Sequence, residues 1–235
     1  RKFYLSWSHY LVIMRIKNID ERHFYEIETY KNQWSKRELA RQYSSSLYER
    51  LALSRNKDEV MKLALEGQII EKPEDIFKDP YVLEFTGLPE LAVYSESELE
   101  TRIIDNLQKF LLELGRGFTY VGRQVRFTFE EEHYRVDLVF YNRLLRCFVL
   151  FDLKIGQLKH QDIGQMQMYV NYYDRKIKLE DENPTIGIIL CKDKKDAIVE
   201  MTLPEDNNQI FASKYQTVLP SKEELKNIIE DKDLE

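Results

Sequence analysis

Apolar side chains recur at helical spacing through the first ~85 residues of the chain. One helix is predicted over residues 22–34. A second is predicted to begin after Ser35, which can cap it together with Glu38, three positions further along. In the second helix the apolar residues recur every four positions, to about residue 54. The apolar positions of the two helices are Phe24, Tyr25, Ile27, Tyr30 and Trp34, then Leu39, Tyr43, Leu47 and Leu51.

The pattern changes after residues 72–90, where four turn-forming residues favour a connector. A broad apolar face predicts a helix over residues 95–115. Alternating runs then predict strands over 118–130, 133–142 and 145–154, with short links that favour antiparallel hairpins. A helix over 159–177, an apolar strand over 184–192, a short strand near 215–220 and a last helix from Ser221 complete the order. The inward positions expected in the 159–177 helix are Ile163, Met166, Met168, Tyr169 and Tyr172.

The composition is that of a soluble globular protein, with 43% apolar and 32% charged residues. No apolar run approaches the ~18 to 20 residues that span a bilayer, and no signal peptide is visible. Because the chain begins with Arg1, we expect it to be a fragment of a longer polypeptide. Cys147 and Cys191 lie in apolar strands, as reduced core thiols do, and reduced thiols favour a cytoplasmic protein. Their positions do not favour a structural zinc site.

The net charge of −6 is distributed unevenly along the chain. Residues 1–57 carry a net +6, whereas residues 58–90 and 181–235 each carry −6. The acidic total argues against a general nucleic-acid coat protein. The basic first segment still leaves room for a local face that binds phosphate.

Three charged residues interrupt strands that are otherwise apolar. Asp137 lies in the middle of the second strand, and Asp152 lies at the end of the third, two positions before Lys154. Residues i and i+2 of a strand share a face, so Asp152 and Lys154 project together. If the two strands pair, Asp137 and Asp152 become neighbours. Two buried carboxylates repel one another unless a cation lies between them, and oxygen ligands suit Mg²⁺ or Mn²⁺.

Each of these residues also has a structural interpretation. An aspartate in an apolar strand can be a satisfied structural carboxylate, and a strand-end Asp-x-Lys can be an exposed ion pair. The combination of an upstream strand aspartate, a terminal Asp-x-Lys and a helix on either side is more specific. A lysine beside a metal can orient a water molecule, so the pattern favours phosphodiester hydrolysis.

The order of these elements resembles that of the PD-(D/E)xK nuclease superfamily, and several short stretches of the sequence resemble its YhcG-like family. The blocks that carry the resemblance are "LELGRGFTYVGRQ", "VDLVFYNRLLRCFVLFDLKIG" and "GQMQMYVN", with "SWSHY" and "WSKRELARQYSSSLYER" near the start. The resemblance implies an α/β fold, with a restriction-endonuclease-like αβββαβ core preceded by a mostly helical, winged-helix-like domain. We place the helical domain at residues 1–88 and the nuclease domain at residues 89–235.

The resemblance also implies roles for individual residues. Asp137 and Asp152 match the family's metal ligands, the carbonyl of Leu153 would be a further ligand, and Lys154 matches the catalytic lysine. The family more often has glutamate at position 152, so the shorter aspartate is a conservative departure. Glu100 is expected to complete the site from the first helix, with Glu96 and Glu98 as rivals.

Other polar residues near these blocks are weaker candidates. Gln165 matches a helix glutamine that some members of the superfamily place near the metal or substrate, and Tyr169 is more often a core residue. Arg123 and Gln124 face either phosphate or a salt-bridge partner. His133 is a possible general base but more often an idle loop histidine, and residues 130–132 are three glutamates of a solvated turn.

The basic segment offers the best place for nucleic acid to bind. Lys36, Arg37 and Arg41 lie near the start of the helix that follows Ser35, where phosphate is also favoured by the helix N-terminus. The alternative is a solvated helix face that packs on the other domain or on a second copy.

These inferences predict a cytoplasmic, Mg²⁺- or Mn²⁺-dependent DNA endonuclease that leaves 5′-phosphate and 3′-hydroxyl ends. A homodimer is expected, because cutting both strands takes two sites. Two rivals stay open: a nucleic-acid-binding scaffold whose nuclease fold is inactive, and an enzyme of the same chemistry that acts on RNA.

Overall fold

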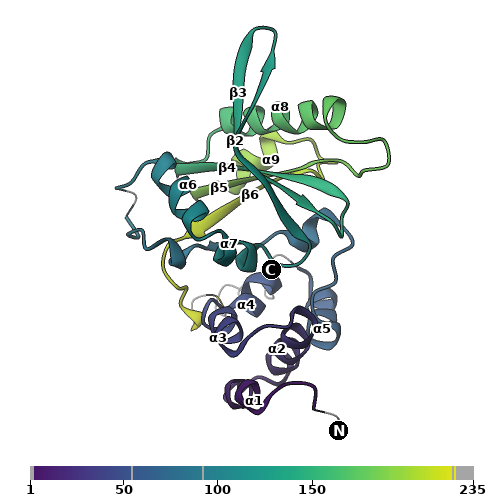
Figure 1. Ribbon diagram of the computed structural model, residues 1–235, viewed down its shortest axis with the longest axis vertical. Helices are drawn as coiled ribbons and strands as arrows, with labels where there is room; N and C mark the ends of the chain where they lie inside the picture. Colours follow the sequence, from purple (N-terminus) through teal and green to yellow (C-terminus); the bar gives the residue numbers. More distant parts are fainter. Residues whose placement is uncertain (1–2, 54, 92, 224, 226–235) are drawn as a thin grey trace. The chain divides into compact units, whose positions relative to one another are not determined.

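The chain forms two units, as described by a computed structural model of residues 3–53, 55–91, 93–223 and 225 (Figure 1). The helical unit contains the described residues up to Ile70, Phe77–Asp79 and those from Leu219 onward. The sheet unit contains Glu71–Ile76 and Pro80–Val218. In the part of the chain described, no helix combines the length and apolarity needed to traverse a bilayer. The boundary expected after residue 88 stays a prediction.

Five helices with defined bounds lie in the described N-terminal part of the helical unit. They are α1 (Trp7–Ile13), α2 (Ile19–Asn32), α3 (Lys36–Ser44), α4 (Leu47–Leu53) and α5 (Lys57–Glu66). The predicted capping box of α3 is present, since Ser35 and Glu38 each accept from the other's backbone N–H. The single helix expected to run to about residue 54 is instead two, because Ser46 takes a positive φ of 53° and ends the first. Among the described residues this unit has no strand, and therefore no wing.

A six-stranded sheet forms the centre of the sheet unit, in the order β1-β6-β5-β4-β3-β2. Its strands are β1 (Tyr81–Val82), β2 (Phe118–Phe129), β3 (Glu132–Asn142), β4 (Cys147–Gln157), β5 (Ile186–Asp193) and β6 (Ile210–Gln216). Pairing is antiparallel through β2, β3 and β4, and parallel through β4, β5, β6 and β1. The predicted αβββαβ order is confirmed.

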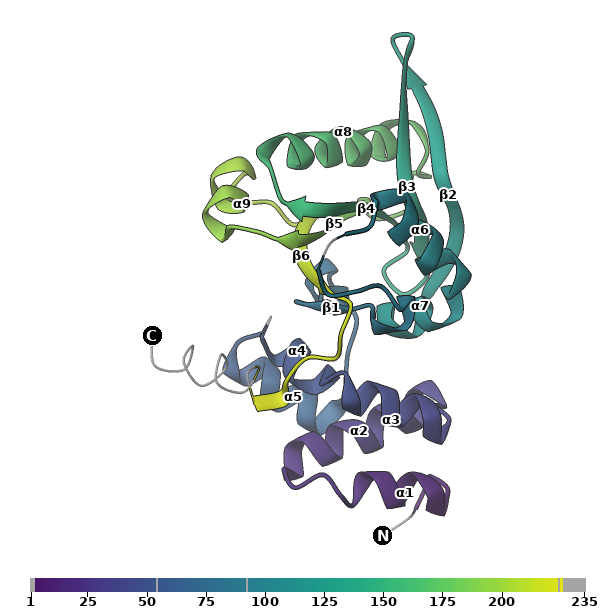
Figure 2. The same cartoon turned by 90° about the vertical axis from the view of Figure 1, so that its left-hand side faces the viewer.

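Helices cover both faces of this sheet (Figure 2). The helix α8 (His160–Lys176) lies on one face, and α6 (Glu96–Asp105) and α7 (Leu107–Leu114) lie on the other. Phe110 of α7 packs edge-on against Phe151 of β4, with ring centroids 5.8 Å apart. The remaining elements are α9 (Asp196–Thr202) and two short 3₁₀ turns, η1 (Pro73–Ile76) and η2 (Glu84–Thr86).

Three sequence predictions differ from the structure in the sheet unit. The helix expected over residues 95–115 is divided at Asn106, whose side-chain amide donates to the Arg102 carbonyl and whose backbone leaves the helical region. The last strand begins at Ile210, earlier than expected, and α9 was not expected. The predicted final helix from Ser221 falls largely outside the described residues.

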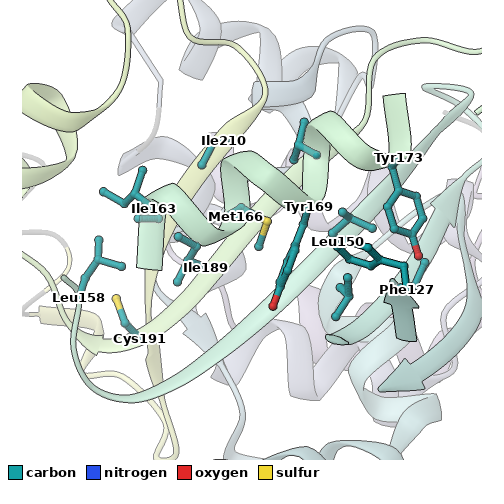
Figure 3. Close-up of a cluster of buried hydrophobic side chains, with 14 residues drawn as sticks. Phe127, Leu150, Leu158, Ile163, Met166, Tyr169, Tyr173, Ile189, Cys191 and Ile210 are labelled. Carbon is teal, nitrogen blue, oxygen red and sulfur yellow. The ribbon is translucent and has the colours of Figure 1, made fainter. Parts of the chain in front are cut away.

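The core beneath α8 is apolar and closely packed (Figure 3). Ile163, Met166 and Tyr169 are buried as predicted, whereas Met168 and Tyr172 are partly buried. Both cysteines are buried free thiols, which confirms that they are core residues. This packing fixes the position of α8 against the strands that carry the aspartates.

Candidate active site

The two aspartates meet where β3 and β4 stop pairing through their backbones. The last backbone pair toward this end is Leu138 with Phe151, and one further step in the same register sets Asp137 opposite Asp152. Beyond that pair, a side-chain hydrogen bond takes the place of a backbone one, because Asp137 Oδ2 accepts the backbone N–H of Leu153 at 2.8 Å. The predicted cross-strand proximity of the two aspartates follows from this register.

Asp152 and Lys154 form an ion pair on one face of β4, as the spacing predicts. Lys154 Nζ lies 2.8 Å from Asp152 Oδ2, and the two side chains are 19% and 3% exposed. Such shielding from water strengthens the attraction between opposite charges. The lysine is therefore held in a fixed place beside the carboxylate.

Gln124 joins the α6 glutamate to this pair of strands. Its Nε2 donates to Glu100 Oε2 at 2.5 Å and to Asp137 Oδ1 at 3.0 Å. Arg123 Nε lies 2.9 Å from Glu100 Oε1, so this arginine has a salt-bridge partner. Glu100 is buried, whereas its rivals Glu96 and Glu98 are exposed.

The central place of Gln124 was missed by sequence reasoning. A register shift in β2 between Tyr120 and Gly122, and a positive φ of 47° at Gln124 itself, bring its amide between the two carboxylates. A signal was present in "VGRQVRF", where two successive polar residues after a glycine interrupt the alternation of the strand.

Burial opposes the ionisation of all three carboxylates. Burial raises the pKa of Asp152 to about 7, opposed by Lys154 and reinforced by Asp137. Burial also raises the pKa of Asp137, against the bond from the Leu153 N–H, and that of Glu100, against Gln124 and Arg123. Burial alone would lower the pKa of Lys154, but Asp152 outweighs it, so the net shift is upward.

Two residues of α8 lie beside this group. Gln165 Nε2 donates to the hydroxyl of Tyr169, which is buried. Burial raises the pKa of Tyr169, and the charges of Asp152 and Asp137 add to the shift, which places its hydroxyl in their field. Gln165 therefore contacts Tyr169, whose hydroxyl is influenced by the charges of the carboxylates.

The donor atoms fit a hard divalent cation in their chemistry. Asp152 Oδ2 and Glu100 Oε1 are buried and accept no well-aligned hydrogen bond within the described chain, although a cation approaches each. Within that same part of the chain, no three His, Cys, Asp or Glu side chains are already close enough to hold a metal. Gln124 stands between Glu100 and Asp137, and Lys154 is drawn to Asp152. A cation would compete with these contacts for the carboxylate oxygens.

The other predicted residues lie away from this group. His133 is exposed, and its Nδ1 lies 2.9 Å from Thr128 Oγ1. The three glutamates of residues 130–132 are exposed, as expected for a solvated turn. Lys36 and Arg37 are exposed at the start of α3, and Arg41 is half-buried.

Comparisons with known proteins show which families this sequence is similar to. The model of the YhcG PDDEXK nuclease domain matches residues 74–230, and that of the DUF1016 N-terminal domain matches residues 2–50. A relative from Escherichia coli (strain K12), called "Putative nuclease YhcG", is 40% identical over 225 residues. The match covers 96% of this chain and 60% of that protein, so the chain spans well under two thirds of its relative's length.

Solved structures show a partial likeness. A repair endonuclease from Pyrococcus abyssi aligns at 17% identity and a TM-score of 0.35, over 55% of this chain and 48% of that one. An EndoMS structure titled as a complex with double-stranded DNA aligns at 15% identity and a TM-score of 0.38, over 57% and 48%.

Proposed function

Because this chain belongs to the YhcG family of PD-(D/E)xK nuclease domains, we propose that it hydrolyses DNA phosphodiester bonds as a divalent-metal-dependent endonuclease. The observation that carries the proposal is the grouping of Asp137, Asp152 and Lys154 at one point between β3 and β4. An acid pair beside a buried ammonium is suited to an anionic substrate and to a hard cation.

Asp137, Asp152, the Leu153 carbonyl and Glu100 would hold Mg²⁺ or Mn²⁺. When bound, such an ion lowers the pKa of coordinated water and neutralises phosphate charge. Lys154 orients the attacking water and stabilises the negative charge that develops on the phosphate oxygens. Asp152 keeps that ammonium in place at 2.8 Å, and Gln124 keeps Glu100 and Asp137 apart.

Two residues of α8, Tyr169 and Gln165, support the proposed site. Tyr169 carries a hydroxyl into the field of the two aspartates, and Gln165 fixes its direction. Gln165 thereby positions a group near the substrate phosphate. This role fits a buried tyrosine whose ring also packs against Phe127, with centroids 5.6 Å apart.

DNA is the proposed substrate, and the helical unit is a proposed second contact. Lys36 and Arg37 are exposed in the first turn of α3, where they can meet phosphates, with Arg41 one turn on. A homodimer is proposed as well, since cutting both strands takes two sites. Sedimentation of the purified chain with and without a DNA duplex tests the assembly.

The test of function is cleavage of supercoiled plasmid and of branched DNA with Mg²⁺, with Mn²⁺ and with EDTA. Lys154→Ala is expected to lower the rate by roughly 10²-fold or more, as when a group that stabilises transition-state charge is removed. Lys109→Ala, an exposed lysine of α7, is the matched control and should cut normally. Absence of cleavage by the wild type, or full activity of Lys154→Ala, would favour the inactive scaffold. Matched RNA and DNA oligonucleotides decide between the two nucleic acids.

A further inference from the structure

The β2–β3 hairpin extends past the site as a two-stranded arm. Beyond the site its strands pair from Val125 with Val136 out to Phe129 with Glu132, whereas β4 pairs with β3 only as far as Leu138. Figures 1 and 2 show this arm projecting from the sheet beside α8. It ends in a two-residue turn at Glu130 and Glu131, both with positive φ. The arm is therefore open to solvent along one side.

The two faces of the arm differ in chemistry. On one face Phe127 stacks on Tyr134 and on Tyr172 of α8, with ring centroids 5.4 and 4.0 Å apart. Strand side chains alternate, so the intervening positions form the opposite face. That face presents Arg126, Thr128, His133 and Arg135, all exposed. One face holds the arm on the core, and the other is polar and basic.

Two arginines stand directly opposite one another on the exposed face. Arg126 pairs with Arg135 in the ladder, and like charges at such positions destabilise a hairpin. Among the described residues neither has an ion-pair partner, and a side-chain hydrogen bond on this face joins Thr128 to His133. The pair is therefore mildly unfavourable for the fold by itself, and a bound anion would offset the repulsion.

The position of the pair suggests which anion. Arg135 precedes Asp137 by two residues, which separates their backbone positions by roughly 6.6–6.8 Å along a strand, a span of one or two nucleotides in DNA, whose rise along the helix axis is about 3.4 Å per nucleotide. Guanidinium groups bind phosphate oxygens in a bidentate manner. We infer that Arg126 and Arg135 form a phosphate clamp for DNA, holding the backbone one or two nucleotides from the bond to be cut. The inference rests on the proposed function, because it takes Asp137 to mark the cleavage point.

The acidic tip limits how DNA can lie on the arm. The glutamates of residues 130–132 are exposed at the turn and repel phosphate. The backbone therefore crosses the arm at the arginine pair and does not follow it to the tip. An acidic protein surface is a less suitable partner than DNA. The same glutamates would repel it, and it would not offer the regularly spaced phosphates that the proposed clamp requires.

The test is binding of the full chain to a fluorescent DNA duplex in EDTA, by anisotropy over a series of salt concentrations. Each lost phosphate contact reduces the slope of log K against log salt by about 0.9. The double variant Arg126→Gln/Arg135→Gln should therefore bind at least about tenfold more weakly and lose about 1 to 2 from the slope. Arg143→Gln, an exposed arginine at the other end of β3, is the matched control and should bind as the wild type does. Arg126→Lys/Arg135→Lys should keep most of the slope.

Several results would overturn the clamp. They are no duplex binding by the wild type, an unchanged slope in the double glutamine variant, or an equal loss with Arg143→Gln. A lower melting temperature of the double variant would also overturn it, because removing a repulsion should leave stability equal or higher. Cleavage is measured separately: if binding depends on the arginines but the wild type does not cut, the phosphate contact stands, whereas the proposed hydrolysis and the placement of the clamp beside a scissile bond both fail.

Discussion

Asp152 is the residue whose ionisation depends most on the fold. It is 2% exposed, its pKa is raised to about 7, and the ammonium of Lys154 lies 2.8 Å from its Oδ2. In the unfolded chain the same carboxyl has a pKa near ~3.9. Between these values the folded protein holds a proton that the unfolded chain has lost.

The first prediction concerns stability against pH in EDTA. A carboxyl whose folded pKa is raised makes the free energy of unfolding fall as pH rises from about 4 to about 7, by at most ~1.4 kcal/mol per pH unit. Asp152→Asn cannot ionise and should lack this fall. Urea unfolding of both proteins at several pH values measures the difference.

Asp105→Asn, at an exposed position of α6, provides the control for this series. It should follow the wild type at every pH. A constant difference in stability between the wild type and Asp152→Asn across the window would contradict the raised pKa.

At this scale the sequence reaches some residues of the site and misses others. The spacing of Asp152 and Lys154 is enough to place them on one face, because strand geometry has a period of two. Gln124 needs the register shift in β2, which depends on how two distant strand positions meet. The local pattern in "VGRQVRF" indicates an irregularity but not the partners that Gln124 meets, so the residue that bridges Glu100 and Asp137 was not predicted.

At the scale of elements, α8 depends on a close approach to β5. A Cβ at Gly187 would lie 2.5 Å from Met166 Sδ and 3.0 Å from Val170 Cγ2. Glycine is therefore required for the helix to sit at its present height above the sheet. Gln165 and Tyr169 reach the aspartates only because α8 is held there.

The second prediction is that Gly187→Ala destabilises the protein by about 1–3 kcal/mol, as overpacking does in cores. Cleavage should fall as well, since α8 must move with its tyrosine. The double variant Gly187→Ala/Met166→Ala should be less destabilised than the sum of its two single changes. Urea unfolding gives the free energies.

The same helix offers a matched control. Gly164 is exposed in α8 and a Cβ there meets nothing within 4 Å. Gly164→Ala should therefore stabilise by about 0.5–1 kcal/mol, through helix propensity alone. A similar loss of stability at both glycines would contradict the packing argument.

Element types were largely predictable, and their ends were not. The three antiparallel strands, α8 and the apolar β5 follow from alternation and helical period. The breaks at Ser46 and Asn106 do not, because each lies inside a continuous apolar pattern and results from local backbone geometry. β6 starts early because it pairs with β5, which is a long-range contact.

At the scale of the whole molecule, the helical unit uses residues from both parts of the sequence. Lys222 contacts the Glu21 carboxylate, lies 3.5 Å from Glu49 Oε1, and its ammonium is 3.8 Å from the centre of the Tyr43 ring. Both glutamates are buried. Local sequence patterns cannot reveal this contact, because Glu21 and Lys222 are 201 positions apart.

The third prediction is that Lys222→Met destabilises the helical unit by about 1–3 kcal/mol. The variant keeps a similar stem but leaves two buried carboxylates without this cation. The lysine side chain is 25% exposed, which keeps the expected loss below that of a fully buried pair. Lys36→Met, at an exposed position of α3, should change stability little. Equal unfolding free energies for Lys222→Met and the wild type would contradict the role of Lys222.

The Lys222 contact also has a consequence for synthesis. A ribosome releases the glutamates of α2 and α4 long before it reaches the codon for Lys222, and domains generally fold in the order in which they emerge. The nascent helical unit therefore lacks the contact from this lysine while the entire sheet unit is translated. Translation that stops shortly after β6 would yield a complete sheet unit attached to a helical unit that lacks Lys222.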